Sequence, residues 1–252
     1  MKMTEESGKR LIASAYDYPI PVIWPTLQAR RWRTNSNATA FMLDCGEGPF
    51  VVTAAHVYES YQECRVQCQH ICPQLGPLCF PMEDRVIGYH GRSILDIVTF
   101  RITSQEVHDL NVHMGRRVLQ GSKMGWPPWK VKEDEQALFV GIPGRQRIDT
   151  PEESSFGRFA LLSPVSSTNE RHFGFGFDRS KWVDAIGKGL PPERYDLGGI
   201  SGAPVIIIDE PEGDDPSWHL GGVAYEAMHE MAEIVYCHHA SFINADGTLN
   251  CP

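Results

Sequence analysis

Short runs of β-branched and aromatic residues recur along the chain of 252 residues, and Gly, Pro, Asp or Asn separates them. This spacing favours an all-β sandwich or barrel, because short strands need a turn at each end. No repeat of solenoid period stands out. We expect strands at 39–43, 50–53, 94–102, 137–142, 158–162, 172–177, 204–208, 219–225 and 233–238.

The run Trp126-Pro127-Pro128-Trp129 is a rigid aromatic connector between two sets of strand runs. We therefore predict an N-terminal extension at 1–19, a first unit at 20–124 and a second unit at 125–252. A chain of this length can bury a substantial core. The stretch between residue 102 and Gly125 is polar and has no strong period.

Three runs carry the side chains that a nucleophilic serine needs. His56 follows Thr53-Ala54-Ala55, Asp96 lies in the run 95–98, and Ser201 lies in the run 196–205. A serine hydroxyl needs a base within hydrogen-bond reach, and imidazole suits this role because it titrates near neutral pH. A carboxylate on the far ring nitrogen fixes the tautomer and stabilises the imidazolium. The order His, Asp, Ser therefore predicts a nucleophilic site.

Glycines on both sides of Ser201 support this interpretation. Gly198, Gly199 and Gly202 permit a tight turn, in which the N–H groups of Gly199 and Ser201 can converge on an oxyanion. Pro204 then leads the chain into a strand. Taken singly, each run has a plainer interpretation: a Gly-Ser turn, a packed histidine, or an aspartate at a strand end. Their joint occurrence in this order favours catalysis.

The three runs resemble those of the trypsin-like (chymotrypsin-fold) serine peptidases, over residues 20–245. Thr53-Ala54-Ala55-His56 matches the histidine motif, Asp96 the aspartate, and Gly199-x-Ser201-Gly202-x-Pro204 the nucleophile motif. The resemblance implies two antiparallel six-stranded β-barrels with the active site in the cleft between them. It also implies that Ser201 is the nucleophile, His56 the general acid/base and Asp96 the orienting carboxylate, with Gly199 and Ser201 as oxyanion donors.

The resemblance further implies a substrate-binding region made of Tyr195, Ala224, Tyr225 and Glu226. The run 220–225 resembles the family strand that pairs with extended substrate. Tyr195 stands six residues before the serine, where members that favour Lys or Arg carry an acid, and Asp196 is one residue off. Glu226 stands where a glycine commonly opens the pocket. A preference for basic side chains is therefore not implied.

The residue before the serine also departs from the secreted members. It is Ile200, whereas members that mature by cleavage have an Asp that receives a new N-terminal ammonium. The resemblance is therefore closer to bacterial-type, non-secreted members without zymogen activation. The N-terminus is polar and acidic and does not resemble a signal peptide, so we expect a cytoplasmic protein. Control by a regulatory protein partner is a further hypothesis.

Net charge and the lengths of apolar runs limit the classes of binding partner that we expect. A net charge of -9 disfavours a broad nucleic-acid surface, and the cluster Arg30, Arg31 and Arg33 is most simply a solvated loop. No apolar run approaches the roughly 18 residues that a membrane-spanning helix needs. We expect a protein or peptide substrate, no cofactor, no metal, no nucleic acid and no membrane.

The seven cysteines are expected to be reduced thiols. We expect a helix from Val57 to about Cys72, which would put Cys64, Cys68 and Cys72 on one face, with Cys79 close by. Burial as small apolar side chains is the favoured interpretation. A zinc site and a disulfide stay open as alternatives.

Three other functions are alternatives to a serine peptidase. The first is a catalytically inactive binding module on the same fold. The second is an esterase of the α/β-hydrolase class, which the order His, Asp, Ser disfavours because that class places its serine first. The third is a metallohydrolase, but the chain lacks a His-Glu-x-x-His run, and His229-Glu230 and His238-His239 are expected to be solvated or packed.

Overall fold

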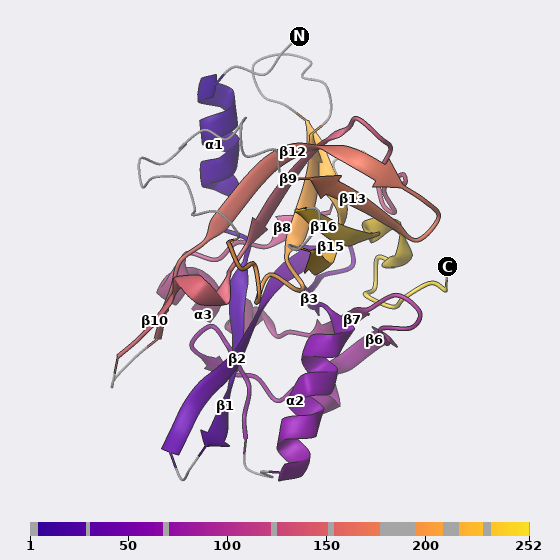
Figure 1. Cartoon of the computed structure of the whole chain (residues 1–252). Coiled ribbons are helices and arrows are strands. Elements are labelled where there is room, and N and C mark those ends of the chain that lie inside the picture. Colours follow the sequence, from indigo (N-terminus) through magenta and orange to yellow (C-terminus); the bar gives the residue numbers. More distant parts are fainter. Residues whose placement is uncertain are drawn as a thin grey trace.

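The computed structural model describes residues 5–28, 31–67, 71–121, 125–150, 154–176, 195–208, 217–228 and 233–251, without the side chains of residues 5, 25–28 and 31–36. Two β-structures make up this part of the chain. Figure 1 shows the first sheet and α2 in the lower part of the view and the barrel strands in the upper part.

The first sheet contains eight strands, in the order β5-β4-β1-β2-β3-β7-β6, with β8 pairing in parallel with β2. Its other pairs are antiparallel, and the 14-residue β2 is long enough to pair with β1, β3 and β8. The bounds are β1 Ile20–Gln28, β2 Arg31–Asp44, β3 Pro49–Thr53, β4 Gln74–Leu75, β5 Leu78–Cys79, β6 Val86–His90, β7 Ile97–Arg101 and β8 Leu119–Gln120.

The second structure is a closed antiparallel barrel in the order β12-β13-β16-β15-β14-β9. A two-stranded hairpin, β10 with β11, stands between β9 and β12 in the chain. The bounds are β9 Gln136–Gly141, β10 Arg147–Asp149, β11 Ser154–Phe156, β12 Phe159–Thr168, β13 His172–Gly176, β14 Pro204–Ile208, β15 Trp218–Met228 and β16 Ile234–His239.

The all-β, two-barrel class predicted from the sequence is confirmed. The barrel has the six antiparallel strands expected of it. The first sheet has eight strands where six were expected, because the two-residue strands β4, β5 and β8 add to the longer ones. Such short strands follow from tertiary pairing and have no sequence period of their own.

Three helices accompany the sheets: α1 Glu5–Ala15, α2 Ala55–Gln67 and α3 Ser104–Met114. Single turns of 3-10 helix occur at Glu83–Arg85, Gly144–Gln146 and Ala240–Phe242. Helix α2 begins at Ala55, two residues before the expected start at Val57, and ends at Gln67, before Cys72. No described helix has the length and apolar character needed to cross a membrane.

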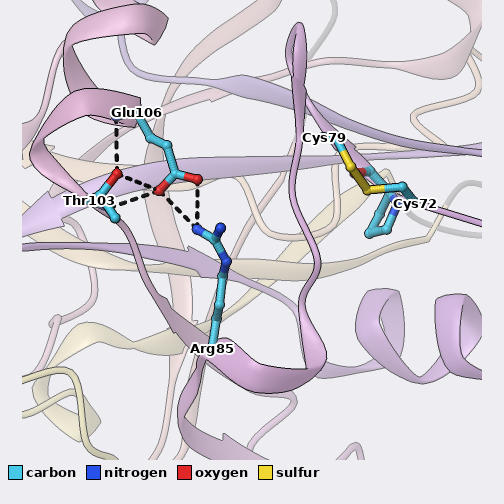
Figure 2. A network of polar contacts seen from close by, with 6 residues as sticks. Cys72, Cys79, Arg85, Thr103 and Glu106 are labelled. Carbon is cyan, nitrogen blue, oxygen red and sulfur yellow. Dashed lines mark hydrogen bonds and ion pairs between the residues drawn. A yellow bond between two sulfur atoms is a disulfide. The ribbon is translucent and has the colours of Figure 1, made fainter.

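The polar stretch after residue 102, which has no strong sequence period, contains α3. Thr103 and Glu106 form a capping box, in which the Thr103 side chain accepts from Glu106 N–H and the Glu106 side chain accepts from Thr103 N–H. Gly115 ends the helix in the left-handed conformation, with φ +65°. Figure 2 shows Arg85 donating to both carboxylate oxygens of Glu106.

The interpretation of Cys72 and Cys79 as reduced, buried thiols is wrong. They form a disulfide (Figure 2), and Cys79 is exposed. The β4–β5 hairpin pairs Gln74 with Cys79, and this fold of the chain brings the two Cα atoms to 5.9 Å. Cys64 remains a free thiol that packs against the first-sheet core, and Cys68 lies outside the described residues.

The buried apolar residues form three clusters. One fills the first sheet and includes Trp24, Tyr61 and Phe100. Another fills the barrel and includes Phe139, Phe173 and Tyr195. The third lies at the junction, because it joins Phe41 and Leu43 of β2 with Leu138, Val140 and Ile206 of the barrel and with Leu11 and Ala15 of α1.

Helix α1 is anchored at the junction. Past its C-terminal end, the Tyr16 carbonyl accepts hydrogen bonds from Arg116 (2.8 Å) and Arg158 (2.9 Å). Burial, together with the charge of the nearby Arg158, lowers the pKa of Arg116 to about 10, although Asp17 opposes this shift. Tyr16, in the link between α1 and β1, thus accepts from Arg116 next to the first sheet and from Arg158 next to the barrel.

Candidate active site

His56 lies in the first turn of α2, directly after β3. The preceding Ala54 and Ala55 are fully buried, and Val51 and Val52 fix the strand in two different clusters. Small side chains before the histidine allow the helix to start against the sheet. The imidazole is therefore carried by a rigid junction of strand and helix.

Asp96 holds both the ring and the backbone of His56. Its Oδ2 is 2.8 Å from His56 Nδ1, and its Oδ1 accepts from His56 N–H at 2.8 Å. Because a carboxylate oxygen accepts, the ring proton belongs on Nδ1, and Nε2 is left with a lone pair. The side chain of Asp96 is 1% exposed and that of His56 is 24% exposed, so one end of the pair is buried and the other reaches solvent.

The backbone at Asp96 is bent to make this contact. Its φ is +43°, in the left-handed region that costs a non-glycine residue about 1 kcal/mol. Its carbonyl accepts from Ala55 N–H at 3.1 Å, and its own N–H donates to Gly91 O at 3.2 Å. Three contacts to residues 55 and 56 compensate the strain and the burial of a carboxylate.

The Ser201 turn lies against the end of β3. Gly199 and Gly202 have φ +99° and +88°. A Cβ on Gly202 would lie 2.1 Å from Thr39 O and 2.2 Å from Thr53 Oγ1, so only glycine fits between the turn and the first sheet. The carbonyl of Ser201 also accepts from Thr39 N–H at 3.0 Å. The structure thus brings the serine turn to the strand that leads into His56.

The amides of Gly199 and Ser201 point away from the bonds that hold the turn. Gly198 O accepts from Gly144 N–H at 2.6 Å, and Ile200 O accepts from Ala203 N–H at 2.9 Å. In a trans peptide the N–H points opposite to the preceding carbonyl. Among the described residues, neither amide has an acceptor. The turn therefore presents two N–H donors that an oxyanion could use.

The Ser201 hydroxyl donates to the Tyr225 carbonyl at 3.3 Å. Within the described residues it forms no hydrogen bond with His56. Catalytic hydrogen bonds are often long or absent without substrate and form in the Michaelis complex.

The four residues expected to bind substrate are divided between core and surface. Tyr195 is buried in the barrel cluster, where its ring stacks on Phe159 at 5.6 Å. Ala224 is also fully buried there. Tyr225 contacts Ser201 through its carbonyl, and the Glu226 side chain is exposed.

Asp196, one residue after Tyr195, has a structural role in the turn. Its Oδ1 accepts from Gly198 N–H at 2.8 Å, and its Oδ2 lies 3.9 Å from Arg145 Nε. Its side chain is more than half exposed. This arrangement is that of a turn cap with a surface ion pair.

Tyr225, which was expected to bind substrate, belongs to a ring cluster whose other members were not identified from the sequence. A bulge in β15 leaves Tyr225 without a partner on β16, and its ring stacks on His238 at 4.2 Å. His172 and Tyr236 complete the cluster. Burial lowers the pKa of His238 to about 4, although a hydrogen bond to Arg171 and the charge of Asp96 raise it. The expectation that His238 is packed is met.

Both ring nitrogens of His239 form hydrogen bonds with backbone groups. Its Nε2 is 2.9 Å from Asn169 O, and its Nδ1 accepts from Val131 N–H at 3.2 Å. Burial lowers its pKa as well. In the part of the chain that the structure describes, no three His, Cys, Asp or Glu side chains gather as a metal site would need.

Neither a protein-family model nor a curated protein sequence matches this chain. Among solved structures, the chain is similar to a crystal structure of tobacco vein mottling virus protease. The two share 7% sequence identity and align with a TM-score of 0.43, over 90% of this chain and 79% of that chain.

Proposed function

We propose that this protein is a serine endopeptidase, with Ser201 as nucleophile, His56 as general base and Asp96 as the carboxylate that orients His56. The observation that carries the proposal is the double hydrogen bond from His56 to the buried Asp96, on the strand end against which the Ser201 turn packs. A structural histidine has no need of a strained, buried carboxylate and a partly exposed ring.

The proposed acylation uses the free lone pair on His56 Nε2. Ser201 Oγ turns from Tyr225 O to His56 and attacks the scissile carbonyl while its proton passes to Nε2. Asp96 stabilises the imidazolium that forms. The C–N bond then breaks, the amine leaves with the proton from Nε2, and an ester joins the acyl group to Ser201. Water reverses these steps and releases the acid.

The oxyanion of the tetrahedral intermediate is assigned to the N–H groups of Gly199 and Ser201. Both lack an acceptor among the described residues, so no existing bond has to break when the charge develops. One such donor is worth about 10²–10³ in turnover. We assign the exposed end of β15, from Tyr225 to Glu226, to an extended peptide, because an open strand edge can pair with one.

We propose that the enzyme prefers an uncharged substrate residue at the position before the scissile bond. Tyr195 and Ala224 belong to the apolar barrel cluster, and Asp196 is engaged with Gly198 and Arg145. A cation would find no buried carboxylate at Tyr195 to offset its desolvation.

Labelling with a fluorophosphonate probe tests the nucleophile. We expect the wild-type protein to be labelled once, and Ser201→Ala to lose the label. Ser155→Ala is the matched control, because Ser155 is exposed on the β10–β11 hairpin, and it should keep the label. Labelling that persists in Ser201→Ala, or a folded wild-type protein that is never labelled, contradicts the proposal and favours an inactive binding module.

Peptide-library profiling separates a peptidase from an esterase. An endopeptidase cleaves internal peptide bonds, and His56→Ala should lose this activity as fully as Ser201→Ala, because the residues act as a unit. Hydrolysis of activated esters without any peptide cleavage would contradict the peptidase assignment.

A further inference from the structure

Thr39 is a fully buried polar residue of β2 that reaches across to the serine turn. Its N–H donates to Ser201 O at 3.0 Å, and its Oγ1 donates to Gly199 O at 2.9 Å. The two acceptors lie on either side of Ile200. One residue of the first sheet therefore binds the turn at two carbonyls that are 160 positions or more away in the sequence.

The acceptor positions of Thr39, on its Oγ1 and its carbonyl, are also filled. Its Oγ1 accepts from Ile142 N–H at 3.0 Å, and its carbonyl accepts from Thr53 Oγ1 at 2.7 Å. Asn37, two residues earlier on β2, donates from Nδ2 to Ile142 O at 3.3 Å. A buried hydroxyl with every bond made is held in one orientation, since any rotation would leave a buried group unpaired.

These bonds complete a series along the turn. The carbonyls of residues 198, 199, 200 and 201 accept from Gly144 N–H, Thr39 Oγ1, Ala203 N–H and Thr39 N–H, in that order. Each peptide plane is thereby fixed, and with it the direction of the N–H on the opposite side. Gly144 and Ala203 thus bind the planes that carry Gly199 N–H and Ser201 N–H, and Thr39 binds the planes that follow each of them, 199–200 and 201–202.

Gly199 needs such a restraint more than other residues. At φ +99° a glycine can rotate its peptide at little cost, and the plane that carries its carbonyl has Thr39 Oγ1 as its partner. A Cβ at this position would lie 2.3 Å from Asn37 Nδ2, so the turn cannot be stiffened by a larger residue. Ile200 N–H, on the other side of this plane, donates to Leu197 O at 3.1 Å, and Thr39 adds the restraint from the first sheet.

We propose that Thr39 is a positioning residue for the oxyanion amides of the turn: it holds the 199–200 and 201–202 peptide planes, which flank the plane that carries Ser201 N–H, and so makes the alignment of these amides depend on the docking of the first sheet onto the barrel. The inference rests on the proposed peptidase function. Thr39 touches no substrate. It acts through the backbone of the turn, and among the described residues its hydroxyl bonds go to Gly199 and Ile142 and not to His56 or Asp96.

The test compares Thr39→Val, Thr39→Ser and Thr99→Val. Valine keeps the shape of threonine but removes both hydroxyl bonds, while serine keeps the hydroxyl. Thr99 is the matched control, because it is equally buried in the first sheet and its hydroxyl also bridges backbone groups, at Gly88 and Gly247. Thr39→Val and Thr99→Val should lose similar stability. A difference in activity between them therefore reports the location of the lost hydroxyl and not a general loss of stability.

We expect Thr39→Val to lower kcat by about 10- to 100-fold with little change in KM, since misplaced donors weaken only the transition state. A peptide boronic acid, whose serine adduct places an oxygen at the oxyanion position, should bind weaker by a similar factor. Thr39→Ser should recover most of both losses, and Thr99→Val should behave as wild type. Equal kcat and boronate affinity in Thr39→Val and Thr99→Val overturn the inference.

A second readout does not depend on activity. Amide hydrogen exchange should show that Ile142 N–H is protected in the wild type and in Thr39→Ser but exchanges faster in Thr39→Val, while His56 N–H, bound to Asp96, stays protected. Unchanged protection of Ile142 in Thr39→Val overturns the inference even if the chain proves to have no peptidase activity. Failure of fluorophosphonate labelling with the expected exchange pattern counts against the proposed function alone.

Discussion

At the scale of single residues, the environment of a side chain decides its chemistry more than its type does. Three histidines near the site illustrate this. His56 keeps a free Nε2 because Asp96 takes Nδ1, His239 has both nitrogens bound to backbone, and His238 is buried under Tyr225. Only the first has the free lone pair and the solvent-facing ring that a general base needs.

The buried His238 predicts a stability loss in mild acid. Burial lowers the pKa of His238 from about 6.5 to about 4, so the unfolded chain takes up this proton first as the pH falls. The contribution of neutral His238 to the free energy of unfolding is fully present above pH 6.5 and is lost progressively between pH 6.5 and 4. Below that range the free energy of unfolding is lower by about 3 kcal/mol. Urea unfolding at several pH values measures it.

His238→Phe is the comparison for this prediction, since phenylalanine can keep the stacking on Tyr225 but has no proton to bind. The difference in unfolding free energy between the two proteins should shift in favour of the variant as the pH falls from 7 to 4. A difference that is independent of pH in this range would show that His238 does not carry the effect.

At the scale of elements, local signals set the ends of helices. Helix α3 has an amphipathic pattern too weak to identify it, but its ends carry a capping box at Thr103 and Glu106 and a left-handed Gly115. Burial raises the pKa of Glu106, but hydrogen bonds from Thr103 and the charge of Arg85 outweigh this and lower it. Glu106 thus joins the helix start to the turn at Arg85.

Thr103→Ala should destabilise the protein by about 1 kcal/mol, because it leaves the N–H of Glu106 without its side-chain acceptor. Ser104→Ala is the control, since Ser104 is exposed and lies one position inside the helix. Thermal or urea unfolding of the two variants gives the comparison. Equal effects would mean that the cap contributes nothing.

At the scale of the whole molecule, the two β-structures meet at a shared core and at a few polar contacts. Thr39 links them beside the proposed site, and α1 links them at the junction cluster through Leu11, Ala15 and the Tyr16 carbonyl. Figure 1 shows α1 next to the barrel strands β9 and β12. The predicted N-terminal extension is therefore partly built into the core.

Leu11→Ala should lower the free energy of unfolding by about 2–3 kcal/mol, because it removes a buried side chain from the junction cluster. Arg10→Ala, next to it on the exposed side of α1, removes only a surface pair with Glu6 and should change stability by less than about 0.5 kcal/mol. Equilibrium unfolding in urea measures both. A small effect of Leu11→Ala would show that α1 is not part of the cooperative unit.

Much of the fold and the central residues of the site could be predicted from short stretches of sequence. The strands at 204–208 and 50–53 follow from β-branched runs bounded by proline or glycine, and the structure has β14 and β3 there. The pairing of His56 with Asp96 was likewise expected from two local motifs. Such signals are readable because backbone geometry depends mainly on nearby residues.

Only the tertiary structure decided which distant groups meet. The bond from Ser201 Oγ to Tyr225 O, the hold of Thr39 on Gly199, the ring stack of Tyr225 on His238 and the disulfide between Cys72 and Cys79 each depend on how separate segments pack. Sequence by itself determined the all-β class and the kinds of side chain available for chemistry. Their orientation was decided by packing, because a hydrogen bond needs a direction and a distance that only the assembled chain defines.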